Sequence, residues 1–226
     1  MSIDPSRTVA ELVLERPSRT RVFEQLGLDY CCGGKRSLAD ACVRRDVALD
    51  VAVAALDAAD GSALESEDWT LASVAQLVDH VVAVHHGLLR TELPRLSGLL
   101  AKCKRAHGTE RPDLVTMAAT FEALRRELEH HMLDEEQRLF PACLDGRAPE
   151  AALLHHLEEE HSAAGELLEQ LRALGGDYEL ETALCNTHRA ALDGLRELEL
   201  DLHQHIHEEN NILFPRVAAR AAAPDS

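Results

Sequence analysis

The chain has 226 residues, of which 46% are hydrophobic and only 3% aromatic, and its formal net charge is −17 at pH 7. This negative charge argues against binding to nucleic acid or to anionic lipid surfaces, because both carry phosphates that would repel it. No apolar run reaches the ~20 residues of a membrane span and the N-terminus lacks the apolar core of a secretory signal, so we expect a cytoplasmic protein.

Residues 1–60 are expected to form a small helical domain with four short helices. Capping residues begin helices, and glycine or proline ends them. The residues that mark these boundaries are, in chain order, Thr8 with Glu11, Pro17, Ser18, Gly27 and Ser37. The fourth helix is rich in Ala and Val and is predicted to end near Asp60. Residues 61–69 are small and polar, which is typical of a linker.

The loop between the second and third helices contains adjacent cysteines, Cys31 and Cys32, followed by two glycines and two cationic residues. Cysteines of a cytoplasmic protein are not expected to form a disulfide framework. Thiols in a Gly-rich turn beside cations are expected to be accessible and to have a lowered pKa. We predict redox chemistry or iron transfer here, with a metal ion in transit or a transient iron–sulfur fragment as variants. The alternative is a buried turn with incidental cysteines.

Residues 70–221 show the 3.6-residue apolar spacing of long helices. The predicted helices are at about 70–103, 113–140, 149–174 and 179–221. Four helices joined by short loops indicate an antiparallel bundle, whose core commonly holds metal sites. The predicted fold is therefore all-α, with a small N-terminal helical domain followed by a four-helix bundle.

Two copies of one pattern lie 74 residues apart within this bundle. The first is His131-x-x-x-Glu135 and the second is His205-x-x-x-Glu209, each continuing to a Leu-Phe-Pro sequence. Residues four apart share one face of a helix, so each copy presents an imidazole and a carboxylate in the same direction. A single such pair is usually a solvated ion pair, but its recurrence in the same register favours a metal site.

Two further histidines extend the repeat, because His86 precedes His131 by 45 residues and His161 precedes His205 by 44. Four histidines with two glutamates exceed a tetrahedral zinc site, and two carboxylates suggest a bridged metal pair. Imidazole and carboxylate ligands suit iron, manganese or zinc. The excess of histidine over carboxylate departs from the Glu-x-x-His di-iron bundles and favours a hemerythrin-like di-iron site that O2 or NO can reach.

Neighbouring carboxylates are expected to orient the imidazoles, and Glu160 and Glu208 are the candidates. Glu136 is set aside as a ligand, because its counterpart in the repeat is Asn210, and asparagine is a poor substitute for a bridging carboxylate.

The Cys-Cys-Gly-Gly loop, preceded by Leu28-Asp29-Tyr30, together with the linker and the two His/Glu repeats resembles the repair-of-iron-centres (Ric) family, of the YtfE and ScdA type, over about residues 7–218. The resemblance implies an ScdA-type N-terminal domain, a hemerythrin-like domain and two irons. It assigns His86, His131, His161 and His205 as terminal ligands and Glu135 and Glu209 as bridges. Cys31 and Cys32 match the cysteine pair of the family, and His107 lies where the family tends to have a histidine, which makes it an accessory candidate.

The resemblance further implies repair of iron–sulfur clusters damaged by nitrosative or oxidative stress, by iron donation or by NO chemistry at an oxo- and carboxylate-bridged di-iron centre. Damaged iron–sulfur proteins, NO or O2 and an unknown electron donor are the expected partners, and a homodimer is one allowed assembly. The rival interpretations are a reversible O2- or NO-binding carrier or sensor, an NO-reducing enzyme, and a structural zinc bundle. Whether the chain is an enzyme stays open at this stage.

Overall fold

The computed structural model describes residues 3–60 and 68–222, with side chains as far as Ala219. Their regular structure is helical apart from an isolated antiparallel bridge between Thr8 and Ser37, which confirms the all-α prediction. None of the described helices is long and apolar enough to cross a membrane. Most of the predicted linker, residues 61–67, lies outside the described residues, and the predicted domain boundaries stay a prediction.

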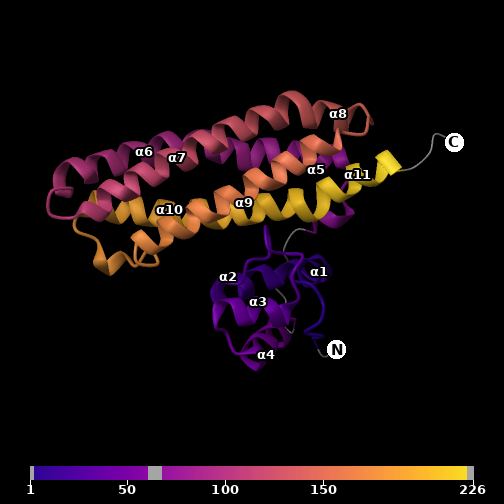
Figure 1. The fold of residues 1–226 in the computed structure, drawn as a ribbon, viewed down its shortest axis with the longest axis horizontal. Helices are drawn as coiled ribbons and strands as arrows, with labels where there is room; N and C mark the ends of the chain where they lie inside the picture. The colour runs from indigo at the N-terminus through magenta and orange to yellow at the C-terminus, as the bar shows by residue number, and fades with distance from the viewer. Residues whose placement is uncertain (1–2, 61–67, 223–226) are drawn as a thin grey trace. The chain divides into compact units, whose positions relative to one another are not determined.

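The helices follow one another along the whole described chain (Figure 1). In chain order the α-helices are α1 (Val9–Glu15), α2 (Thr20–Leu26), α3 (Leu38–Arg45), α4 (Leu49–Asp60), α5 (Val74–His80), α6 (Gly87–His107), α7 (Pro112–Asp134), α8 (Phe140–Leu144), α9 (Ala151–Leu174), α10 (Asn186–Glu208) and α11 (Phe214–Ala222). The chain divides into two compact units, one made of Met1–Leu77 with His203–Ser226 and the other of Val78–Leu202.

Local sequence signals account for three of the helix ends in the first unit. Thr8 and Glu11 form the predicted capping box, in which each side chain accepts a hydrogen bond from the backbone N–H of the other residue. Gly27 ends α2 in the left-handed region, with a φ of 63°, which glycine adopts without a steric penalty. Ser37 caps α3 as predicted, since its hydroxyl accepts from the backbone N–H of Asp40.

The predicted helix cap at Ser18 is wrong. Pro17–Arg19 form a 3-10 turn, η1, and α2 begins only at Thr20 without a side-chain cap. The guanidinium of Arg19 is buried and lies 2.6 Å from a carboxylate oxygen of Asp60, at the far end of α4. This pairing over 41 residues positions the turn, and no local pattern could have indicated it.

The second unit is built around the bundle helices, and Figure 1 shows α6, α7, α9 and α10 running side by side. Its core is mostly aliphatic, as the composition predicts, because leucine ridges of neighbouring helices interlock. The fully buried side chains include Leu96 on α6, Leu124 on α7, Leu171 on α9 and Leu192 on α10.

The helix predicted to begin at residue 179 begins at Asn186 instead. Asp177 and Tyr178 have left-handed backbones, with φ of 54° and 59°, and Leu180–Thr182 form a 3-10 turn, η5. Tyr178 is buried in the core of the second unit, so tertiary packing holds this connecting segment in a non-helical conformation and the helix begins only after it. The helix predicted to start near residue 70 starts at Val74.

Candidate metal centre

The helices that carry every predicted ligand except His161 widen into π-helical turns at or beside these residues, whereas α9, which carries His161, is a continuous α-helix. These turns are η3 (Val81–His86), η4 (Glu135–Leu139) and η6 (Glu209–Leu213). In the last two, the N–H of Phe140 donates to the carbonyl of Glu135 and that of Phe214 donates to Glu209, five residues back. π-Turns are rare and frequent at functional sites. The proline after each Phe has no N–H to donate, so the repeated Leu-Phe-Pro was a usable signal for the widened turn.

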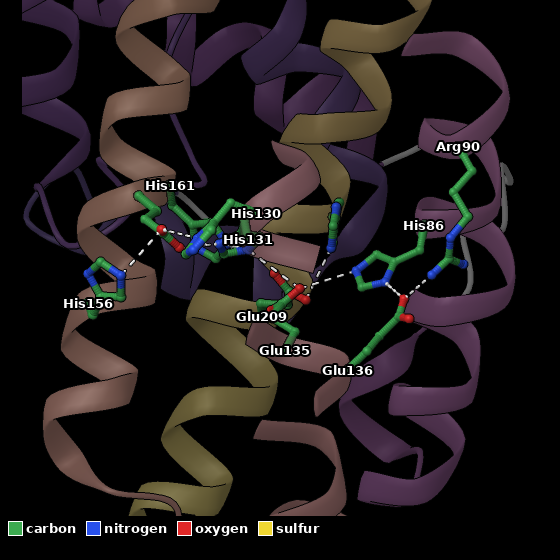
Figure 2. A network of polar contacts seen from close by, with 11 residues as sticks. His86, Arg90, His130, His131, Glu135, Glu136, His156, His161 and Glu209 are labelled. Atoms are coloured by element: carbon green, nitrogen blue, oxygen red, sulfur yellow. Dashed lines mark hydrogen bonds and ion pairs between the residues drawn. The ribbon is translucent and has the colours of Figure 1, made fainter. Parts of the chain in front are cut away.

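The six predicted ligands form two overlapping groups of four buried side chains. The groups are His86, Glu135, His205 and Glu209, and His131, Glu135, His161 and Glu209. Within each group, one potential ligand atom per residue lies within 4.8 Å of all the others. Both carboxylates belong to both groups, as bridging ligands would. In Figure 2 the two glutamates lie between His86 and His131. Their role as ligands stays a prediction.

Each of these imidazoles places its Nε2 against another predicted ligand. Nε2 of His86 lies 3.2 Å from a carboxylate oxygen of Glu135, and Nε2 of His205 lies 3.1 Å from one of Glu209. Nε2 of His131 lies 3.4 Å from Glu135 and 2.9 Å from Nε2 of His161. The Oε1 atom of Glu135 is buried and has no hydrogen-bond partner among the described residues. A buried carboxylate oxygen without a partner is costly, and a cation bound there would remove that cost. The donor set therefore fits a metal ion with imidazole and carboxylate ligands.

Carboxylates on the other ring nitrogen orient two of these imidazoles. Glu136 lies 2.6 Å from Nδ1 of His86 and also pairs with Arg90 (Figure 2). Glu160 lies 2.9 Å from Nδ1 of His131. An Nδ1–H that donates to a carboxylate leaves the Nε2 lone pair for a metal.

The pKa values of the two orienting carboxyls reflect these contacts. Burial raises the pKa of Glu136, but its hydrogen bonds with His86 and Arg90 outweigh that effect and leave the pKa below its ordinary value. Burial also raises the pKa of Glu160, but the hydrogen bond with His131 outweighs that effect and leaves the pKa below its ordinary value. Both side chains therefore stay ionised at neutral pH.

The sequence predicted one of these two partners and missed the other. Glu160 contacts His131 as expected, whereas Glu208 accepts a hydrogen bond from Gln204 on its own helix. Glu136 was set aside because it breaks the repeat, yet its carboxylate supports His86 on another helix. The only local signal was its place directly after Glu135.

His107 belongs to neither group of predicted ligands. It is the last residue of α6 and is half-buried. His86 immediately precedes the first residue of α6, so the helix places the two residues roughly 30 Å apart at 1.5 Å per residue.

The cysteine loop is organised by a carboxylate that the sequence did not single out. Asp29 accepts backbone hydrogen bonds from Cys31, Cys32 and Gly33, at 3.1, 3.0 and 2.8 Å. The two cysteines are not joined in a disulfide, and Cys31 is buried while Cys32 is half-buried. A Cβ added to Gly33 would lie 2.7 Å from an oxygen of Asp29, so the turn can close over the carboxylate only because this residue has no side chain.

The expected lowering of thiol pKa is wrong for Cys31, and so is its expected accessibility. Its hydrogen bond with Cys32 and its burial raise the pKa of Cys31 well above the ordinary value, and the charges of Cys32 and Asp29 act in the same direction. The hydrogen bond with Cys32 and burial, and not the cations that follow the turn in sequence, therefore dominate the shift in the pKa of this thiol.

Comparison with known families matches almost the whole chain. Residues 77–217 match the hemerythrin HHE cation binding domain, and residues 5–60 match a domain of unknown function (DUF542) that forms the N-terminal part of ScdA-type proteins. The iron-sulfur cluster repair protein YtfE of Escherichia coli O81 is 36% identical over 212 residues, which cover 93% of this chain and 96% of the relative. The YtfE protein of Salmonella paratyphi B is 36% identical over 213 residues, with the same coverage. This chain therefore belongs to the YtfE family, in which an ScdA-type N-terminal domain precedes a hemerythrin-type cation-binding domain.

Proposed function

We propose that this chain repairs iron–sulfur clusters damaged by nitrosative or oxidative stress, using a di-iron centre in its hemerythrin-type domain. The relatives at 36% identity are named for iron–sulfur cluster repair. The observation that carries the proposal is the buried set of four imidazoles and two carboxylates in which both carboxylates belong to both ligand groups. Damaged iron–sulfur proteins are its proposed clients, and the cytoplasm is its proposed compartment.

In this proposal the histidines of each ligand group would hold one iron, and Glu135 and Glu209 would be the ligands that both irons share. When bound, the iron pair supplies redox chemistry and open positions for NO or O2. Glu136 and Glu160 keep the Nε2 atoms of His86 and His131 directed at the centre, because each accepts from the opposite ring nitrogen. Burial of the ligands excludes competing water.

Cys31 and Cys32 are proposed to act in redox steps or in iron transfer, with an unknown electron donor. They lie in the proposed N-terminal domain, residues 1–60, which a linker at 61–69 joins to the proposed bundle domain at 70–221. A reversible O2 or NO carrier would not need this thiol pair. Cys31→Ala/Cys32→Ala should therefore impair repair while leaving the iron content of the bundle unchanged.

The test of the centre is anaerobic iron quantitation with Mössbauer spectra on the Glu135→Leu and Glu209→Leu variants. We expect each to lose the bridged pair and the ability to reactivate a NO-damaged iron–sulfur enzyme. Glu129→Leu is the matched control, because Glu129 lies on α7 with its side chain half exposed and pairs with Arg125. If either bridge variant keeps two irons with unchanged spectra, the bridging assignment is refuted.

A further inference from the structure

The cysteine loop brings two thiols and a carboxylate to one point. Asp29, Cys31 and Cys32 each offer a potential ligand atom, and these atoms lie within 4.8 Å of one another. The Sγ of Cys31 is 3.8 Å from the Sγ of Cys32 and 3.4 Å from Oδ1 of Asp29. All three residues belong to the first unit and to none of the ligand groups of the bundle.

These separations match those between ligands of a single tetrahedral ion. Two thiolates bound at about 2.3 Å lie about 3.8 Å apart on such an ion, and a thiolate lies about 3.6 Å from a carboxylate oxygen bound at about 2.1 Å. A disulfide would require the sulfurs to approach to about 2.05 Å. The side chains are therefore spaced for a shared cation.

The loop is also held rigidly, as a binding site requires. The backbone between the two sulfurs is fixed by the N–H groups that donate to Asp29. Tyr30 is buried, its carbonyl accepts from the side-chain amide of Asn211 at 3.3 Å, and its ring centroid lies 5.5 Å from that of His207. A half-buried Cys32 leaves a route by which an ion can enter and leave.

We propose that Asp29, Cys31 and Cys32 form a second metal site, which binds one thiophilic divalent ion such as Fe2+ or Zn2+. On binding, the two thiol protons pass to solvent, and neither sulfur nor metal changes oxidation state. Three protein ligands leave the fourth position open, as in sites whose ion exchanges ligands. The inference depends on the proposed function only for the use of the ion as cargo, and the binding itself does not require iron in the bundle.

The test is an anaerobic titration of the reduced, metal-free, full-length protein with Co2+. Charge-transfer absorption from sulfur to cobalt reports thiolate bonds, which the His/Glu ligands of the bundle cannot produce. We expect the band to reach the intensity of one Co2+ bound by two thiolates, while the bundle takes up further Co2+ without adding to the band, and we expect it to be absent from Cys31→Ser/Cys32→Ser. Asp29→Asn should weaken binding more than about tenfold, since even the loss of an outer partner costs about 10–100-fold. Cys42→Ser, at a buried thiol of α3 in the same unit, is the matched control and should keep the band.

The proposal is overturned if the wild type shows no sulfur-to-cobalt band, if the double serine variant keeps it, if Asp29→Asn binds with unchanged affinity, or if Cys42→Ser abolishes it. Far-UV circular dichroism checks folding, and Cys32→Ser alone serves if the double variant unfolds, because this side chain is only half-buried. Glu135→Leu separates the two sites. It should lose bundle metal and keep the band, whereas a band that disappears with Glu135 refutes a separate site and leaves the repair proposal standing.

Discussion

The clearest test of the centre is Glu136→Leu, which removes the carboxylate 2.6 Å from Nδ1 of His86. His86 is fully buried, and its Nδ1–H would lose the acceptor that keeps Nδ1 protonated and directs the Nε2 lone pair to the centre. Loss of such a partner typically weakens metal binding about 10–100-fold, which equals about 1.4–2.7 kcal/mol. The metal-free protein should lose only about 1 kcal/mol of stability, because the Glu136 side chain is 27% exposed and solvent screens its ion pair with Arg90.

The assay is an anaerobic competition between the protein and a chelator for Fe2+, with chemical denaturation of the metal-free protein beside it. Glu129→Leu removes a carboxylate of α7 that pairs only with Arg125 among the contacts described, and its affinity should stay within about twofold of the wild type. If Glu136→Leu also stays within that range, or if its loss of stability equals its loss of binding energy, Glu136 does not orient His86 for a metal.

Three further outcomes follow from single contacts. Glu160→Gln weakens the charged acceptor 2.9 Å from Nδ1 of His131 and should lower metal affinity about tenfold in the same competition assay. Gly34→Ala should cost about 1–3 kcal/mol of unfolding free energy, measured in denaturant, because the new Cβ would lie 2.6 Å from the carbonyl oxygen of Tyr30. Burial lowers the pKa of His188 in the folded protein. As the pH is lowered through the unfolded pKa of about 6.5, the unfolded chain binds more protons than the folded one, so the free energy of unfolding decreases. Melting temperatures at about pH 7.5 and about pH 5.5 should therefore differ less in His188→Gln than in the wild type.

Each of these has a control on the same chain. Glu159→Gln alters an exposed carboxylate beside Glu160 and should leave metal affinity unchanged. Gly98→Ala adds a Cβ that meets nothing within 4 Å and should raise stability by about 0.5–1 kcal/mol, since glycine is unfavourable inside a helix. His155→Gln changes an exposed imidazole and should keep the full pH dependence. An equal effect in a variant and its control would contradict the corresponding contact.

The cysteine loop shows how a local prediction can miss the dominant neighbour. From sequence, Lys35 and Arg36 indicated a cationic turn that would lower the thiol pKa. In the folded loop, Asp29 reaches back across the turn to the backbone of both cysteines, and Cys31 is buried. Side-chain directions in a turn depend on its hydrogen bonds, which the order of charged residues does not specify.

The sequence by itself determined what depends on spacing within one helix. A 3.6-residue turn places His131 with Glu135, and His205 with Glu209, on common faces, and capping chemistry marks the starts of α1 and α3. These relations hold whatever the helix packs against, so they could be predicted before any tertiary contact was known.

Only the tertiary structure decided which residues from different helices meet. Two contacts join residues whose separation in sequence follows no rule: Glu136 with His86, and Arg19 with Asp60. The late start of α10 likewise could not be predicted from local sequence. Such pairings result from the packing of whole side chains into a shared core, where volume and burial outweigh local preference.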